Sequence, residues 1–344
     1  MAYEKPAYSL NKVDRAGTSL FNINASDEEL DRAVAILSNW RAAHSYPLNA
    51  LNMTLKNRAH SVDQNASIAQ RLKRWDSVVR KLERWDTMHL SQMQDIGGCR
   101  AVVDRITDLY ELVALYQSRP LRHSLHKTRD YINFPKNDGY RSVHLMYRFS
   151  GKATSLPWDK LRVEIQLRTK LQHAWATAVE TVDAFTGQSL KFGEGEQDWR
   201  RFFALMGSVH ANIEQTPTIP GAHNTNVQLA AEVRLLERKL LVVDCLNSFA
   251  QITQFVADQR GITRDWYLIR LMPEQKSVTV KGFPKFKLKQ AEEELAKAER
   301  EFKDTRNQAL LASADSLKEL KKAYPNYFAD TRFFTSVLRR FLSV

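Results

Sequence analysis

The sequence predicts an α+β protein with a small mixed sheet flanked by helices, followed by a helical and α+β C-terminal region. Two segments, "SVHLMYRF" (142–149) and "LRVEIQLR" (161–168), alternate polar with apolar residues and are rich in β-formers, which predicts strands. Residues 26–44 repeat apolar side chains at helical spacing, and Ser26 with Glu29 forms a capping-box pattern near their start. Together these segments indicate a mixed α+β domain that ends near residue 215.

The other elements expected before residue 215 follow from the same two periodicities. Helices are expected at 49–60, 106–117, 169–185 and 195–213. Residues 66–86 carry apolar side chains on one helical face and arginine and lysine on the other, which predicts a further amphipathic helix. A strand is expected at 100–104, and a strand or an irregular segment at 119–127.

A linker is expected at "EQTPTIPGAHN" (214–224), which contains two prolines and one glycine. The elements expected after it are a long amphipathic helix at 226–260, two strands within 266–283 joined at Pro273-Glu274, a helix at 287–305, a strand at 309–314 and helices near 315–323 and 329–342. We therefore divide the chain into an N-terminal helical segment (1–48), a central α+β domain (49–215) and a C-terminal region (225–344).

Composition and charge narrow the class of protein. The chain has 344 residues, of which 43% are hydrophobic and 26% charged, so it can bury a core. Its formal net charge of +12 favours anionic partners such as nucleotides or nucleic acid. No run approaches the ~18 apolar residues of a membrane span, and the N-terminus lacks a signal peptide, so we expect a soluble cytoplasmic protein without a membrane partner. Cys99 and Cys245 lack metal-type spacing and are expected to be reduced and buried.

The stretch "MQDIGGCRAVVDR" (93–105) places Asp95 and then Gly97-Gly98 ahead of a short apolar run. One interpretation is a turn between a helix and a strand, with glycine for backbone freedom. The other is a metal-binding acid at a strand edge, where glycines let a phosphate-bearing ligand approach. These residues alone leave both interpretations open.

A second stretch, "RDYINFPKNDGYRSVHLMYRF" (129–149), groups Arg129, Lys136 and Arg141 around Tyr140. Gly139 frees the backbone just before the tyrosine. Cations and an aromatic ring on one loop can clamp phosphates while a base stacks on the ring. The alternative is a hairpin turn that merely precedes a strand.

A third group lies along the predicted strand at 161–168. Glu164, Gln166 and Arg168 alternate, so they point to one face, while the apolar residues between them point to the other. Such a polar row suits a polar site, or else a solvated sheet face. The usual nucleotide-binding glycine motifs, the H-E-x-x-H motif and a cysteine–histidine zinc cluster are all absent from the sequence.

Taken together, four stretches in this order resemble the synthetase domain of the RelA/SpoT family over roughly residues 50–190. These stretches are "QRLKRWDSVVRKLER", "DIGGCR", "DYINFPKNDGYRSVHL" and "VEIQLRT" with the following "HAWA". The resemblance implies a nucleotidyltransferase-like fold and an ATP-dependent pyrophosphokinase that transfers the β,γ-pyrophosphate of ATP to a ribose 3′-hydroxyl. The usual acceptor in the family is GDP or GTP, which gives the stringent-response alarmone (p)ppGpp. Small toxic synthetases similar to this family use the tRNA 3′ end or make adenine alarmones instead.

The resemblance also implies roles for particular residues. Asp95 and Glu164 match the catalytic carboxylates, with Asp95 binding Mg²⁺ and Glu164 acting at the 3′-hydroxyl as a base or metal partner. The residues that match ATP-binding positions are Arg71, Lys73, Lys81, Arg100 and Arg129. The residues that match acceptor-side positions are Lys136, Tyr140, His144, Gln166 and Arg168. Pyrophosphoryl transfer needs mainly positioning and charge neutralisation, which such a set supplies.

Several questions stay open at this point. The acceptor is a guanine nucleotide, an adenine nucleotide or the tRNA 3′ end, the last with translation inhibition or phage defence as its consequence. An inactive nucleotide-sensing module is the alternative from another class. Since no "HD" dipeptide occurs and only about 50 residues precede the synthetase region, we expect no hydrolase. The C-terminal region is expected to form a homo-oligomer, or to regulate the enzyme itself or through an antitoxin-like partner.

Overall fold

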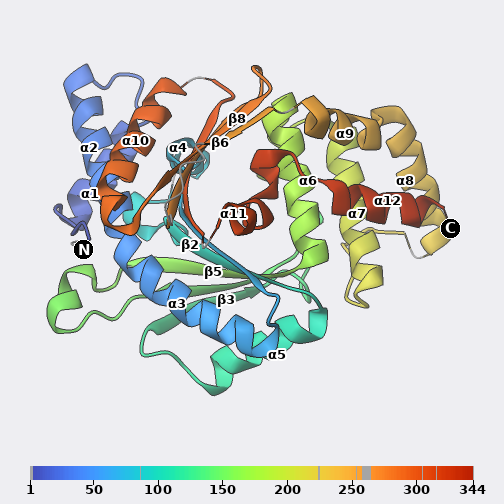
Figure 1. The fold of residues 1–344 in the computed structure, drawn as a ribbon, viewed down its shortest axis with the longest axis horizontal. Coiled ribbons are helices and arrows are strands. Elements are labelled where there is room, and N and C mark those ends of the chain that lie inside the picture. Colours follow the sequence, from blue (N-terminus) through green and yellow to red (C-terminus); the bar gives the residue numbers. More distant parts are fainter. Residues whose placement is uncertain are drawn as a thin grey trace.

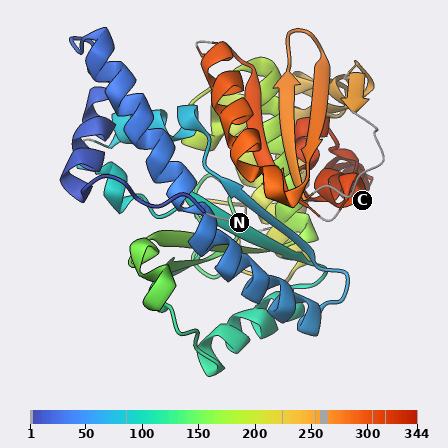
Figure 2. The same ribbon diagram turned by 60° about the vertical axis from the view of Figure 1, so that its left-hand side comes forward.

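A single mixed β-sheet runs through the computed structural model, which describes residues 3–85, 87–223, 225–252, 254–257, 265–303, 305–314 and 316–343. Among these residues the sheet has nine strands in the order β3-β4-β5-β2-β1-β9-β7-β8-β6 (Figures 1 and 2). Helices cover both of its faces (Figure 1). The α+β class expected from the sequence is confirmed.

Five strands come from the part of the chain before the linker. They are β1 (Ser67–Leu72), β2 (Gly97–Val103), β3 (Ser124–Asp130), β4 (Val143–Arg148) and β5 (Arg162–Thr169). The strands predicted at 142–149 and 161–168 are confirmed as β4 and β5. The strand predicted at 100–104 is present but begins earlier, at Gly97, and the segment predicted at 119–127 forms β3 only from Ser124.

The single helix predicted over 66–86 is wrong. Its first part is strand β1, which pairs antiparallel with β2 from Ser67 opposite Val102 to Leu72 opposite Gly97. Helix α4 starts only at Trp75 and ends at Arg84. Ile68 and Leu72 keep their contact with the apolar core as alternate residues of a strand, so burial is satisfied without a helix.

One face of this half of the sheet is the apolar core. Helices α3 (Ser45–Val62) and α5 (Ile106–Ser118) cover it (Figure 1). The buried strand residues that face these helices are Cys99, Ala101, Val103, Val143, Leu145, Tyr147, Val163, Ile165 and Leu167. Every second residue is therefore committed to the core, and the residues between them point to the opposite face.

The remaining helices before the linker frame that opposite face and the N-terminal side. Helix α6 (Lys170–Thr186) follows β5 directly, and α7 (Gln197–Ile213) packs against α6. Helices α1 (Leu10–Ser19) and α2 (Asp27–Ala43) form a separate apolar cluster with α4. The capping box predicted from Ser26 and Glu29 is confirmed at the start of α2.

The C-terminal region contains nine of the described helices and strands. They are α8 (Asn226–Leu240), α9 (Val242–Ile252), β6 (Gln254–Ala257), β7 (Trp266–Met272), β8 (Ser277–Phe283), α10 (Leu288–Glu301), β9 (Gln308–Ser313), α11 (Leu317–Ala323) and α12 (Arg332–Leu342). The predicted strand pair, the three helices predicted after it and the strand at 309–314 are confirmed with shifted ends.

The long helix predicted over 226–260 is wrong. It breaks at Leu241, whose φ of 49° lies in the left-handed region, and the chain enters strand β6 at Gln254. The end of the predicted range, 258–260, lies outside the described residues. Breaking the helix lets α8 and α9 pack separately onto the core that α6 and α7 form.

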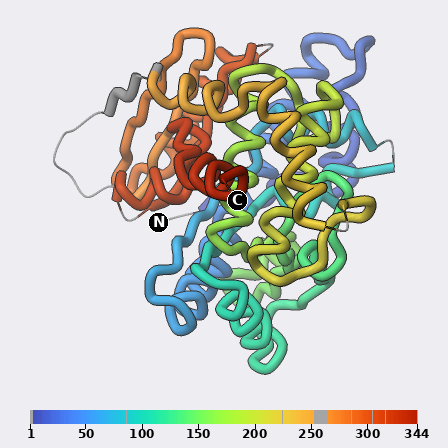
Figure 3. The backbone as a smooth tube through the Cα atoms, turned by 90° about the vertical axis from the view of Figure 1, so that its right-hand side faces the viewer, coloured from blue at the N-terminus to red at the C-terminus, as the bar shows by residue number. Residues whose placement is uncertain are grey.

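The C-terminal strands continue the same sheet rather than forming one of their own. Strand β9 pairs antiparallel with β1, with Gln70 opposite Ser313 and Arg71 opposite Ala312. Figure 3 shows the C-terminal strands and helices, in orange and red, against the rest of the chain. The C-terminal region therefore shares one sheet with the rest of the chain, although the sequence suggested a second unit. The domain limits 1–48, 49–215 and 225–344 remain predictions.

Over the part of the chain that the structure describes, no helix combines the length and the apolarity needed to cross a membrane. Cys99 is buried and Cys245 is half-buried, and neither forms a disulfide.

Helix α12 offers a test of the shared core. Phe334 is fully buried, and its ring lies 6.4 Å from that of Phe202 and 5.9 Å from that of Phe203, both on α7. Phe334→Ala should lower the free energy of unfolding by roughly 3–5 kcal/mol in a single transition measured with urea. The matched control is Phe333→Ala, because Phe333 is exposed on the same helix. A second, unaffected transition in the Phe334 variant would show that the C-terminal region unfolds on its own.

Candidate active site

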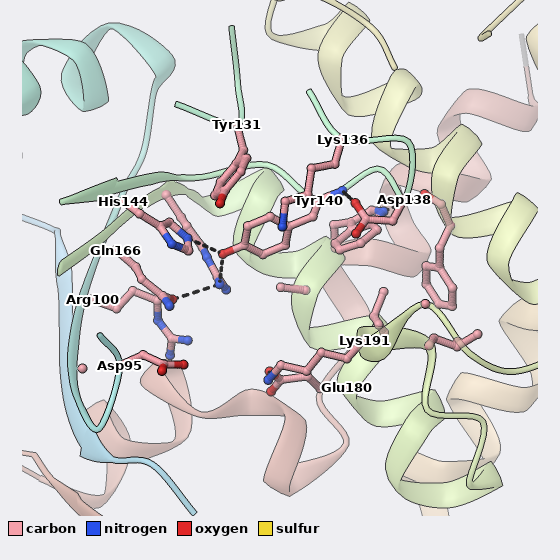
Figure 4. Close-up of a pocket in the computed structure, with 18 of the residues that line it drawn as sticks. Asp95, Arg100, Tyr131, Lys136, Asp138, Tyr140, His144, Gln166, Glu180 and Lys191 are labelled. Atoms are coloured by element: carbon pink, nitrogen blue, oxygen red, sulfur yellow. Dashed lines mark hydrogen bonds and ion pairs between the residues drawn. The ribbon is translucent and has the colours of Figure 1, made fainter. Parts of the chain in front are cut away.

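The polar face of the sheet opens into a cavity of ≈ 1110 Å³. Strands β1, β2, β4 and β5 line one side, and helices α6 and α7 with the short helix η3 (Leu190–Phe192) line the other (Figure 4). The strand register brings the side chains together, since Arg100 lies opposite Gln166 and Gln166 opposite His144. In the next row, Gly98 lies between Arg71 and Glu164.

The two glycines after Asp95 lie inside strand β2, not in a turn, and neither has a positive φ. A Cβ on Gly97 would meet the Cβ atoms of Leu48 and His44 at 3.4 and 3.5 Å, so this glycine allows α3 to pack closely. A Cβ on Gly98 would meet only the Glu164 carbonyl oxygen, at 3.9 Å. Gly98 therefore keeps the cavity floor open, as the ligand-approach interpretation requires.

Asp95 lies between two lysines. The Lys73 ammonium, just after β1, donates to its Oδ2 at 2.7 Å, and the Lys81 ammonium, on α4, donates to its Oδ1 at 2.9 Å. Burial alone would raise the pKa of this carboxyl group, but the two lysines hold it well below its usual range. Asp95 is therefore ionised near neutral pH.

Glu164 is paired with His144 on the neighbouring strand β4, through the ring Nδ1. Burial alone would lower the pKa of His144, but Tyr140 and Glu164 raise it to about 9. For Glu164 the signs are reversed: burial alone would raise its pKa, but the positive charge of His144 outweighs burial, so the net shift of the pKa is downward. Near neutral pH this is an ion pair of protonated histidine and carboxylate.

Tyr140 extends this chain of contacts towards α6. Its hydroxyl lies 2.7 Å from Nε2 of His144 and accepts a hydrogen bond from Arg168 at 2.8 Å (Figure 4). Burial alone would raise the pKa of Tyr140, but Arg168 and His144 lower it to about 8. The Lys136 ammonium lies 5.2 Å from the ring centroid.

Gly139 lets the Tyr140 loop approach α7 closely. Its φ is +88°, and a Cβ there would meet the Phe203 carbonyl oxygen at 2.7 Å. The predicted need for glycine before the tyrosine is confirmed.

Glu164, Gln166 and Arg168 share one face of β5 and line the cavity, as predicted. Arg168 donates to the Gln166 side-chain oxygen at 3.0 Å. The alternative of a solvated sheet face is wrong, because both Glu164 and Arg168 are buried.

The cavity also contains Arg71, Lys73, Lys81 and Arg100, four of the five predicted ATP-binding residues. The fifth, Arg129, is exposed on β3 and does not line the cavity. It lies opposite His144, and β4 and β5 separate it from β2.

Arg141, which the sequence placed beside Tyr140, points elsewhere. It is buried and donates to the Ile132 carbonyl oxygen at 3.1 Å and to the Thr216 hydroxyl at 2.7 Å. The apolar and polar residues of β4 alternate from Val143 onward, and Arg141 lies before that strand begins.

Some cavity residues escaped the sequence analysis. Glu180, on α6, pairs with Lys191 at 2.5 Å, and although burial raises its pKa, Lys191 and Arg71 lower it below the usual range. Glu180 ends the stretch "HAWATAVE", which begins with the "HAWA" of the family resemblance, so the sequence could have indicated it as a site residue.

Tyr324, after α11, gave no such signal, because it is more than 200 residues away from its partner. The Arg100 guanidinium lies 5.5 Å from the Tyr324 ring centroid and donates to the Ala323 carbonyl oxygen.

The donor set fits Mg²⁺ that is shared with substrate phosphates. Among the described residues, no group of three or more histidine, cysteine, aspartate or glutamate side chains forms a complete metal site. Mg²⁺ in phosphoryl-transfer sites usually takes one or two carboxylates and completes its shell with water and phosphate oxygens. Asp95 and Glu164 are close enough for each charge to affect the other, and both are ionised.

A family described as "Region found in RelA / SpoT proteins" matches residues 70–183, which include every predicted site residue. This segment is a RelA/SpoT-family region. GTP pyrophosphokinase YwaC of Bacillus subtilis is 28% identical over 170 residues, covering 45% of this chain and 80% of that protein. Uncharacterized protein Rv1366 of Mycobacterium tuberculosis is 28% identical over 200 residues, covering 56% of this chain and 65% of that protein.

Two solved structures with similar folds are small alarmone synthetases of Bacillus subtilis. Small alarmone synthetase 2 has a TM-score of 0.44 and 21% identity, covering 52% of this chain and 94% of that chain. Small alarmone synthetase 1, solved with its product pppGpp, has a TM-score of 0.42 and 21% identity, covering 49% of this chain and 88% of that chain. The matches leave about half of this chain uncovered.

The His144–Glu164 pair can be tested without any substrate. An NMR titration of the His144 ring should give a pKa of about 9, and Glu164→Gln should lower that pKa. Because this pKa exceeds the ~6.5 of an unfolded histidine, protonated His144 contributes stability that is fully present below pH ~6.5 and is lost as the pH rises through about 9, while Glu164, whose pKa is lowered, loses its contribution in acid. His44, whose pKa burial lowers to about 4, serves as an internal control. A His144 pKa near 6.5 would contradict the ion pair.

Proposed function

We propose that this chain is an ATP-dependent pyrophosphokinase that transfers the β,γ-pyrophosphate of ATP to a ribose 3′-hydroxyl. The observation that supports it best is the cavity in the RelA/SpoT region, which two ionised carboxylates, Asp95 and Glu164, line together with several arginines and lysines. Such a site neutralises a triphosphate and offers a carboxylate to a hydroxyl, as pyrophosphoryl transfer requires. The name of the relative YwaC, a GTP pyrophosphokinase, supports the same reaction class.

The proposed reaction assigns the two carboxylates different roles. The acceptor 3′-oxygen attacks the β-phosphorus of ATP, the bond from that phosphorus to the oxygen of the α-phosphate breaks, and AMP leaves. Glu164 accepts the proton of the 3′-hydroxyl, and its ion pair with His144 fixes the carboxylate on the cavity floor. Lys73 and Lys81 turn from Asp95 towards the phosphates. Asp95 and Glu164 would hold Mg²⁺, which would supply further positive charge at the phosphates.

For the acceptor we propose a guanine nucleotide, GDP or GTP. Tyr140 offers a ring edged by Lys136, and His144, Gln166 and Arg168 lie beside it, so a base and a ribose can be held next to Glu164. The arginine pair Arg71 and Arg100 lies on the other side of Glu164 and suits the adenine of ATP.

The tRNA 3′ end is the second candidate acceptor. Its support is a group of cations, Lys191, Arg200 and Arg201, that line the cavity between η3 and α7, but Lys191 pairs with Glu180 and Arg201 with Glu232. The basic stretch "KGFPKFKLK" (281–289) does not line the cavity, and its Lys281 pairs with Glu294. Incubation with labelled ATP and separately with GDP, GTP, ATP and bulk tRNA decides among the acceptors and against an inactive sensing module.

For the C-terminal region we propose a regulatory use. Tyr324 and the Ala323 carbonyl oxygen contact the Arg100 guanidinium, which matches an ATP-binding position of the family. ATP must therefore displace this contact, and a partner that draws the segment away would assist it. The expected homo-oligomer, the antitoxin-like partner, the cytoplasmic location and the absence of hydrolase activity stay predictions.

Asp95→Asn and Glu164→Gln should each reduce turnover by roughly 10²–10⁴-fold at a temperature at which circular dichroism shows the variant to be folded. The reason is that one variant removes charge at the phosphates and the other removes the proton acceptor. Turnover is measured as transfer of label from ATP to the acceptor. The control is Glu83→Gln, an exposed acid on α4 outside the cavity, which should keep wild-type turnover. Near-normal turnover in either cavity variant would refute the assignment.

Tyr324→Ala should tighten binding of a non-hydrolysable ATP analogue by roughly tenfold, because a cation–π contact of about 0.5–2 kcal/mol no longer competes. Calorimetry gives the affinity. Since Tyr324 is buried, the same variant should melt at a lower temperature. Tyr267→Ala, in the same apolar cluster, is the control that loses stability without gaining affinity. Weaker ATP binding in the Tyr324 variant would mean that the ring supports the nucleotide site.

A further inference from the structure

A second contact of the C-terminal region lies behind the cavity, at the turn between β1 and α4. Glu299, near the end of α10, forms a bidentate ion pair with Arg41 of α2, at 2.6 and 2.8 Å. The two side chains are only 9% and 7% exposed. The partners are 258 residues apart in the sequence.

The pair also binds the backbone of the turn. Arg41 Nε donates to the Lys73 carbonyl oxygen at 2.9 Å, and Glu299 Oε1 accepts from the Trp75 backbone N–H at 3.1 Å. The turn is thus held on both sides of Arg74. From its other side, the Lys73 N–H donates to the Ile96 carbonyl oxygen at 2.8 Å.

The turn between β1 and α4 positions two lysines on the side of the cavity where ATP is expected to bind. Lys73 reaches from it to Asp95, and α4, which starts at Trp75, carries Lys81 to the same carboxylate. A buried ion pair adds little net stability, because two charges must leave water. What this pair does supply is a fixed position for a carbonyl oxygen and an N–H that otherwise have no partner in the turn's own helix or strand.

We propose that Glu299 and Arg41 are positioning residues for Lys73, so that the C-terminal region forms part of the framework of the ATP site. The identification of the ligand as ATP rests on the proposed function. The region then contributes in two separate places: Glu299 holds the phosphate-binding lysine in place, and Tyr324 covers Arg100. Loss of the Glu299 contact should weaken the ATP site even where the Tyr324 contact has been removed.

The experiment uses the full chain in a Tyr324→Ala background, so that the covered arginine does not mask the result. Arg41→Met with Glu299→Leu removes the buried pair and fills its volume, which usually leaves stability nearly unchanged. Arg41→Lys keeps the charge facing Glu299 but removes the Nε donor to Lys73. The control is Glu301→Gln, on the same helix, because Glu301 pairs with Arg270 and does not touch the turn.

Binding of a non-hydrolysable ATP analogue should weaken roughly tenfold in the double variant and in Arg41→Lys, as expected when a charge-assisted hydrogen bond is lost. Affinity for the acceptor should not change. The Glu301 control should bind both as the background does. An equal loss for ATP and acceptor, or an ATP affinity that follows only the melting temperature, would overturn the proposal.

Hydrogen exchange at the amides of residues 72–76 separates this proposal from the proposed function. Exchange there should accelerate in the double variant, since Trp75 loses its acceptor, while the amides of β4 and β5 keep their protection. If the background chain binds no ATP analogue, the proposed function fails, and the exchange data alone decide the positioning. Unchanged exchange at 72–76 would overturn it.

Discussion

The register of strand β2 between β1 and β5 is the constraint on which both the core and the cavity depend. Gly98 lies opposite Arg71 on one side and Glu164 on the other, so this single row sets the distance between the two ends of the site. A shift of one residue would turn Cys99, Ala101 and Val103 from the core towards the cavity. Burial of the apolar face against α3 and α5 therefore fixes the positions of the polar side chains.

Within this frame, the carboxylates of Asp95 and Glu164 are each neutralised by their own cations. Lys73 and Lys81 hold Asp95, and His144 holds Glu164. Burial alone would raise the pKa of both carboxyl groups, and the cations reverse the sign of the shift. The site thus stays ionised without a ligand and keeps its charges in place in advance of substrate.

A triphosphate that enters this cavity competes with the carboxylates for the lysines. Lys73 and Lys81 already face a negative group, so the exchange of Asp95 for phosphate costs less than moving the lysines out of water. Asp95, once released, is a free oxygen ligand for a cation that arrives with the phosphates. The pairing of Asp95 with two lysines therefore suits the phosphate transfer that we propose.

Local sequence patterns predicted much of the candidate site. The alternation of Glu164, Gln166 and Arg168 predicted a polar sheet face, and the sheet places it in the cavity. The resemblance to RelA/SpoT synthetases added Asp95 and the cations around it. Both predictions rest on residues that are close together in the sequence. Over such short stretches, the alternation of side chains along a strand is enough to fix the face to which each one points.

The errors arose where distant pairing decided the outcome. Residues 67–72 lie within a helical pattern, yet they form a strand because β2 and β9 supply partners on both edges. Arg129 lies next to His144 as its position in the strand requires, but the strand order puts β3 at the edge of the sheet. Tyr324 could not be predicted to meet Arg100, since nothing local specifies a contact across more than 200 residues.

The C-terminal region acts on the structure through strand β1. Without β9, β1 would be an open edge with unpaired backbone groups next to the cavity. Strand β9 pairs with it, and the Tyr324 hydroxyl donates to the Gln70 carbonyl oxygen at 2.8 Å. Glu299 binds the backbone just beyond its end. All three contacts fall on the side of the cavity that carries Arg71, Lys73 and Arg100, whereas Tyr140 and His144 lie beyond β2 and β5. A movement of the C-terminal region would therefore directly affect the side of the cavity where ATP is expected to bind. It would affect the acceptor side only through the sheet.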